Sequence, residues 1–147
     1  MSGVTDVLRM FETQVRERVS QLAGGLCGAT PDGHGNYLML DLPWPANPAR
    51  CRLGAFYSPR DCLEVSFAIS ETRGPAERQI HAGNDAANMV SQTVDFLRDI
   101  VSGRVVVDVT RYRWLWFQPY HLAFFRDSSS SAGRNVVETL RWSDSSR

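Results

Sequence analysis

The chain has 147 residues, which is enough for one domain with a substantial core, and its 43% hydrophobic and 22% charged residues are ordinary for a globular protein. Sixteen acidic residues balance sixteen basic ones, so we expect no overall electrostatic attraction to nucleic acid or to an anionic membrane. All the basic residues are arginine, which excludes Schiff-base chemistry and a P-loop role for a lysine side chain.

The predicted cellular compartment follows from targeting signals and cysteines. The sequence shows no signal-peptide pattern and no apolar run of membrane-spanning length. Its cysteines, Cys27, Cys51 and Cys62, are odd in number and have no CxxC spacing. We therefore expect a cytoplasmic protein with reduced thiols.

The chain begins with a predicted helix. Over residues 4–23 apolar residues recur at three- and four-residue spacing, and Gly24 and Gly25 follow as a stop signal. Residues 37–42 then predict a strand, and the PWPANP segment at 43–48 predicts a loop.

Residues 50–57 and 62–70 predict a hairpin, joined by a Ser-Pro-Arg-Asp turn at 58–61. The second strand alternates apolar and polar residues, which is typical of a sheet with one buried face and one wet face. Glu64 falls on the wet face, and that face is the first place where we expect a binding surface.

Residues 71–83 predict a polar loop. The next segment, 84–102, is the clearest helix in the chain, because a regular apolar stripe follows Asn84 as an N-cap and ends before Gly103.

The stretch 104–125 is the richest in β-branched and aromatic residues and predicts strand. The apolar residues change parity between Val109 and Tyr112. Either a bulge near Thr110 or a tight turn at 108–111 accounts for the change, and the length of the run favours two strands and a turn.

The end of the chain predicts a separate segment. Residues 127–134 contain four consecutive serines and predict a linker, and 135–142 predict a short helix followed by a frayed tail. The expected organisation is a single domain at 1–126 and this linker and tail at 127–147.

These elements together predict an α+β fold. We expect a largely antiparallel sheet of about five strands with helices packed on one face, in the order α-β-β-β-α-β-β with an optional final helix.

Residue types that carry catalysis or bind metals give little signal. The three histidines and three cysteines match no zinc-ligand spacing, and no cysteine has the local signature of a nucleophile. We therefore expect no metal, no cofactor and no catalytic residue.

The mixture of arginine and aromatic residues is the strongest candidate for a binding surface. Tryptophan, tyrosine and arginine dominate protein–protein hot spots, whereas tyrosine and tryptophan can also simply form core. The predicted partner-binding residues are Trp44, Arg50, Arg52, Arg111, Arg113, Trp114 and Trp116.

The segment FLRDIVSGRVVVDV and the aromatic strand after it resemble the small α+β immunity proteins that bacteria encode beside polymorphic toxins. That resemblance implies a non-enzymatic protein that binds and blocks a toxin. The element order is also similar to that of secretion chaperones, which implies a dimer that binds an unfolded stretch of an effector.

The sequence thus predicts a protein-binding module whose partner is another protein, a toxin or an effector, with no role in binding nucleic acid or membrane. Two alternatives stay open. One is a homodimer built on the aromatic strands. The other is a small-molecule or enzymatic site between helix and sheet, lined by Tyr37, Trp44, Trp114 and His121.

Overall fold

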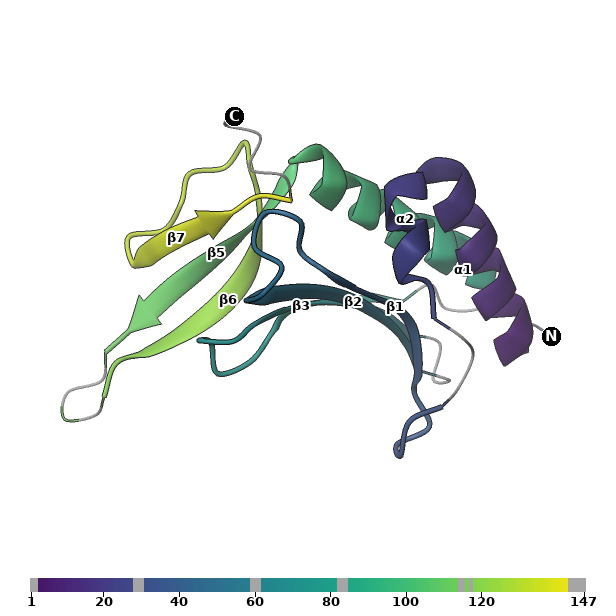
Figure 1. Ribbon diagram of the computed structural model, residues 1–147, viewed down its shortest axis with the longest axis horizontal. Coiled ribbons are helices and arrows are strands. Elements are labelled where there is room, and N and C mark those ends of the chain that lie inside the picture. Colours follow the sequence, from purple (N-terminus) through teal and green to yellow (C-terminus); the bar gives the residue numbers. More distant parts are fainter. Residues whose placement is uncertain are drawn as a thin grey trace.

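A computed structural model describes residues 3–27, 31–58, 62–81, 85–113, 116 and 118–142. The fold is α+β, as predicted, but its strands form two antiparallel sheets of four and three strands where one sheet of about five was expected. Two helices lie on one side of the four-stranded sheet, and the three-stranded sheet stands at its end (Figure 1).

The helices use the apolar stripes that the sequence predicts. Helix α1 spans Val4–Arg18 and buries Val7, Phe11 and Val15, and the 3-10 helix η1 (Ser20–Gly25) replaces the last turns of the predicted helix. Helix α2 spans Ala86–Ser102 and ends at Gly103, whose φ of 83° is the left-handed conformation that favours glycine.

The start of α2 differs by one residue from the prediction. Asp85 is the N-cap, and its carboxylate accepts a hydrogen bond of 3.0 Å from the backbone N–H of Asn88. The predicted cap, Asn84, lies outside the described residues.

The first sheet is an antiparallel meander of β1 (Tyr37–Pro43), β2 (Cys51–Ser58), β3 (Cys62–Ile69) and β4 (Ala76–His81). The predicted hairpin is confirmed as β2 and β3, although 59–61 of its predicted turn are not among the described residues. In β3 the side chains of Leu63, Val65 and Phe67 are buried beneath the helices, so Glu64 and Ser66 lie on the helix-free face.

Strand β4 corrects the prediction of a polar loop over 71–83. The segment AERQIH places Ala76 and Ile80 in the core and leaves polar residues between them exposed. Its alternation is weak because Arg78, on the buried side, is charged; the guanidinium lies 4.8 Å from the centre of the Phe96 ring.

The second sheet has the order β6-β5-β7, from β5 (Val105–Tyr112), β6 (Tyr120–Asp127) and β7 (Val136–Leu140). Strand β5 runs through 108–111, so the favoured turn there is wrong. The alternative, a bulge in this strand near Thr110, is not seen either, because β5 pairs with β6 residue by residue from Val105 to Tyr112. The register shift with β7 between Val109 and Thr110 skips Val137, a residue of β7.

Strand β7 replaces the predicted C-terminal helix. It pairs with β5, and Trp142 beyond it is buried. The residues from 136 to 142 are therefore part of the packed fold, and the predicted boundary at 126 does not separate them from it.

The two sheets meet where β4 and β6 lie side by side. The backbone N–H of Arg73 donates a hydrogen bond of 3.0 Å to the carbonyl oxygen of His121 across this junction. Phe96 of α2 contacts Arg78 of the first sheet and Phe125 of the second, so both sheets turn the same side toward α2. Their other sides together form a helix-free face.

Candidate functional site

The outer side of the second sheet carries apolar side chains that no described element covers fully. The strand register places Tyr112, Tyr120, Leu122, Phe124 and Val136 on this side. The opposite side of the same sheet holds Val107, Val109 and Ala123, which are buried. The outer side also carries the ion pair of Asp108 with Arg126, and Val106 is buried there, so its exposed apolar part is the half that holds Tyr112, Tyr120, Leu122 and Phe124. An exposed apolar patch of this kind makes that half a candidate interaction surface.

The aromatic residues on this side are held in place by neighbouring rings and a cation. Tyr112 and Tyr120 are cross-strand partners whose rings stack with centroids 5.6 Å apart. The Arg73 guanidinium lies 4.3 Å from the centre of the Tyr120 ring. Phe124 is 46% exposed. The arrangement presents flat, ordered rings to the solvent.

Two of the predicted arginines and one tryptophan lie at the end of the β5–β6 hairpin. Arg111 and Arg113 are exposed, and neither forms an ion pair with a carboxylate of the described residues. Trp116 is 92% exposed. Trp114, also predicted to bind the partner, lies outside the described residues.

We call this region the Arg/aromatic surface. Its outer-side part consists of Tyr112, Tyr120, Leu122, Phe124 and Val136 with Arg73, and its hairpin end adds Trp116, Arg111 and Arg113. Arg111 is the cross-strand partner of His121, so its side chain leaves the sheet on the side opposite to Tyr112 and Tyr120.

The other three predicted partner-binding residues lie outside this surface and contact other parts of the chain. Trp44 is fully buried, and its ring contacts Phe67 and Trp142 with centroids 4.1 and 5.0 Å away, so it is core and cannot be a surface anchor. Arg50 holds the two sheets together through Glu71 and Glu138. Arg52 pairs with Asp41 at 2.9 Å.

The residues predicted to line an alternative pocket between helix and sheet do not come together in the structure. Tyr37 begins β1 and Trp44 follows its end, so the length of the strand, about 20 Å, separates them. His121 belongs to the second sheet. Trp114 is not among the described residues.

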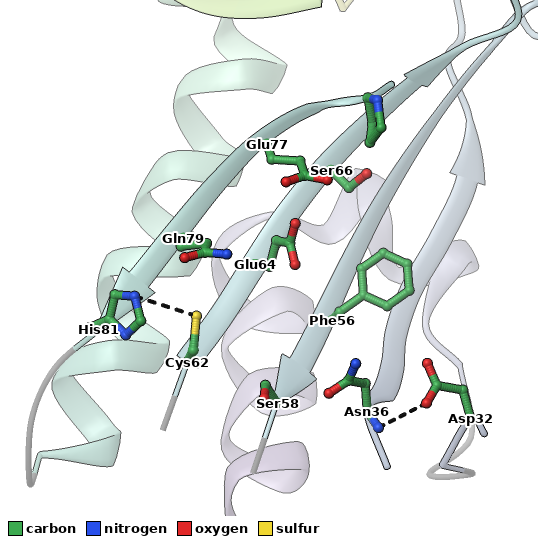
Figure 2. Close-up of a pocket in the computed structure, with 11 residues that line it drawn as sticks. Asp32, Asn36, Phe56, Ser58, Cys62, Glu64, Ser66, Glu77, Gln79 and His81 are labelled. Carbon is green, nitrogen blue, oxygen red and sulfur yellow. Dashed lines mark hydrogen bonds between the residues drawn. The ribbon is translucent and has the colours of Figure 1, made fainter. Parts of the chain in front are cut away.

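The helix-free face of the first sheet contains a second feature, a hollow of about 610 Å³ (Figure 2). Strands β2, β3 and β4 supply its floor, with Asp32 and Asn36 at one end. Its described lining carries the carboxylates of Asp32, Glu64 and Glu77 and no arginine. We call it the acidic hollow.

Two of these carboxyl groups interact directly. Glu64 lies opposite Gln79 in the β3–β4 register, which makes Glu77 its diagonal neighbour. Burial raises the pKa of Glu64, and the charge of Glu77 and a side-chain hydrogen bond with it raise that pKa further. A cation in the hollow would relieve this repulsion.

Cys62 and His81 are direct cross-strand partners at the edge of the hollow, with Sγ 3.7 Å from Nε2. Burial and the charge of Glu64 raise the pKa of the Cys62 thiol. A thiol held protonated is a poor nucleophile, so this pair does not favour covalent catalysis.

Among the described residues, no cluster of three or more histidine, cysteine, aspartate or glutamate side chains could hold a metal ion. None of the described helices combines the length and apolarity needed to cross a membrane.

Sequence reasoning missed the residues that β4 contributes to the hollow, because the segment was assigned to a loop. The polar residues of AERQIH at alternate positions, Glu77, Gln79 and His81, were the available signal. It also missed Leu122 and Phe124, whose exposure depends on which side of the second sheet α2 covers.

Comparison with known proteins adds no identification: no protein-family model, curated protein or solved structure gives a significant match to the chain. The functional conclusion therefore depends on the residues of this chain.

Proposed function

We propose that the protein is a non-enzymatic binding module that docks a protein partner on the Arg/aromatic surface, as an immunity-type inhibitor docks its target. The observation that carries the proposal is the apolar patch on the outer side of the second sheet, where Phe124 is 46% exposed and the Tyr112 and Tyr120 rings stack, while the other side of the sheet packs on the core. The proposal places the protein in the cytoplasm, where its three free cysteines stay reduced.

The residue types of the surface support a protein partner. Tyr112, Tyr120 and Phe124 would lose solvent contact and act as anchors, since rigid rings bury large areas with little loss of conformational entropy. Arg111 and Arg113 would form bidentate hydrogen bonds with carboxylates of the partner. The partner surface would thus be apolar at its centre and acidic at its rim.

Site-specific photo-crosslinking tests the proposal. A photoreactive residue replaces Phe124 in the full chain, which is then illuminated in lysate of its native host. We expect a discrete protein adduct at Phe124. The matched control places the same residue at Glu17, which is exposed on α1, and should give no such adduct.

The arginine contribution is tested on the same adduct. Arg111→Ala with Arg113→Ala should lower the affinity for the crosslinked partner at least tenfold, or about 1.4 kcal/mol. Crosslinking at Glu17 and Phe124 alike, or an affinity unchanged by the arginine substitutions, would contradict the proposal.

A further inference from the structure

The chain carries two features of opposite charge on surfaces that its own fold leaves open. The acidic hollow has the carboxylates of Asp32, Glu64 and Glu77 and no arginine among its described lining residues. Strands β5 and β6 run away from the helices (Figure 1), and Arg111 and Arg113 lie at the far end of β5. A net charge of zero for the whole chain hides this separation.

We propose that two copies of the chain pair reciprocally, with the hairpin end of each copy seated in the acidic hollow of the other. The pairing goes beyond the proposed function because it concerns the protein without its partner. It would cover part of the Arg/aromatic surface until a partner displaces the second copy.

The first argument is charge complementarity. Seven of the fourteen described arginines form ion pairs with carboxylates of the same chain, for example Arg50 with Glu138 and Arg126 with Asp108. Arg111 and Arg113 are among the other seven, and the described lining of the hollow holds no arginine. An arginine beside Glu64 and Glu77 would satisfy both sides with charge-assisted hydrogen bonds.

The second argument is the fit of shapes and apolar groups. The hollow, at about 610 Å³, is in the range of cavities that hold a substantial ligand. Phe56 and Pro75 give its lining an apolar part. Trp116 is 92% exposed in the single chain, and burial against such a lining would remove it from water.

The third argument is closure. Each copy has one hairpin end and one hollow, so a pair related by a two-fold axis fills both hollows and leaves neither hairpin end exposed. In the open alternative, each copy inserts its hairpin end into the hollow of the next copy. The resulting filament would have an empty hollow at one end and a free hairpin end at the other.

A charge-swap experiment tests the pairing, with light scattering as the measurement of mass. One variant carries Glu64→Arg and Glu77→Arg, and the other carries Arg111→Glu and Arg113→Glu. The wild type should be a dimer, and each variant alone should be a monomer, because like charges then meet at both contacts. An equimolar mixture should form a dimer again, because every arginine then faces a glutamate.

Controls separate a lost contact from a lost fold. Circular dichroism should show both variants folded, and Glu17→Arg, on the exposed side of α1, should leave the dimer unchanged. If either reversal variant does not fold, the corresponding glutamine substitutions replace it. Each glutamine variant should then raise the dimer dissociation constant at least tenfold, and mixing the two should recover part of the loss.

A wild type that stays monomeric at all concentrations, or folded variants that remain monomeric when mixed, would overturn the pairing. Larger species with the same charge dependence would overturn its two-fold arrangement. The proposed function is judged separately: a monomeric wild type that still gives a heterologous adduct at Phe124 would refute only the pairing, whereas the absence of any adduct at Phe124 would refute the proposed function.

Discussion

The indole N–H of Trp44 donates a hydrogen bond of 2.6 Å to the carbonyl oxygen of Arg141, 97 positions further along the chain. Trp44 belongs to the segment after β1, and Arg141 follows β7 in the other sheet. The bond and the contact between the Trp44 and Trp142 rings therefore give the two sheets a second connection besides the β4–β6 junction.

Replacement of Trp44 with phenylalanine should lower the free energy of unfolding by about 2 kcal/mol, because the substitution removes the hydrogen bond and leaves a gap in the core. Urea denaturation followed by circular dichroism measures the change. Trp116→Phe is the matched control in the monomer, where Trp116 is 92% exposed, so its effect at low protein concentration should stay within about 0.5 kcal/mol. Equal effects of the two substitutions would contradict the buried role of Trp44.

Asp108→Asn should destabilise the second sheet by about 2 kcal/mol, because a nearly buried ion pair loses one partner. Asp108 accepts hydrogen bonds from Arg126 Nε at 2.5 Å and from Thr139 Oγ1 at 2.8 Å, so its carboxylate links all three strands. Asp41→Asn breaks the exposed pair with Arg52 and should change stability by less than about 1 kcal/mol. Thermal unfolding of the two variants in parallel gives the comparison.

In the single chain, at concentrations below the dissociation constant of the proposed pair, Glu64→Gln should stabilise the fold at pH 7 by a few tenths of a kcal/mol up to about 1 kcal/mol, because it removes a like-charge neighbour of Glu77. The raised pKa of Glu64 means that the folded state holds a proton more tightly than the unfolded state, so stability is lost as pH rises through the folded-state pKa. The advantage of the variant should therefore vanish below a pH of about 4. This trend is measured by denaturant unfolding at intervals of about one pH unit between pH 3 and 8, with the denaturant midpoint read at each pH. An advantage that is independent of pH would contradict it.

Glu138→Gln should show the opposite pH dependence. Hydrogen bonds from Arg50 lower the pKa of Glu138, so its contribution is present above the unfolded-state pKa and is lost as pH falls through the folded-state value. The variant should be less stable than the wild type by about 0.5–1 kcal/mol at pH 7, a small value because the ion pair is partly exposed. In acid the two proteins should have equal stability. The same denaturant series measures it, and a penalty that persists in acid would rule out the charge as its origin.

The sequence predicts most clearly those elements whose own pattern decides their structure. The apolar stripe of α2 and the glycine after it define that helix, and the alternation from Leu63 to Ile69 defines β3 and its wet face. Strand β4 was missed because Arg78 occupies a core-facing position, where the cation rests on a ring that only the folded chain supplies. Strand β7 was missed because five residues form a strand only when a neighbour such as β5 pairs with them.

The sequence predicted only part of the candidate site, because the exposure of the other predicted residues depends on tertiary contacts. The residue types at Arg111, Arg113 and Trp116 pointed to the hairpin end, where these residues are exposed. Trp44, Arg50 and Arg52 have the same residue types but are engaged within the fold. Composition cannot distinguish an anchor for a partner from an anchor for the core, because both require the same large rings and forked cations.

The contact between Trp44 and Trp142 also sets an order of events during synthesis. Residues around Trp44 leave the ribosome early, yet the ring and the carbonyl that satisfy the indole arrive only with residues 141 and 142. The same late segment carries β7, which completes the second sheet. A nascent chain can therefore form the meander and its helices first. The Trp44 indole then lacks its hydrogen-bond acceptor and its contact with Trp142 until β7 and the residues after it emerge.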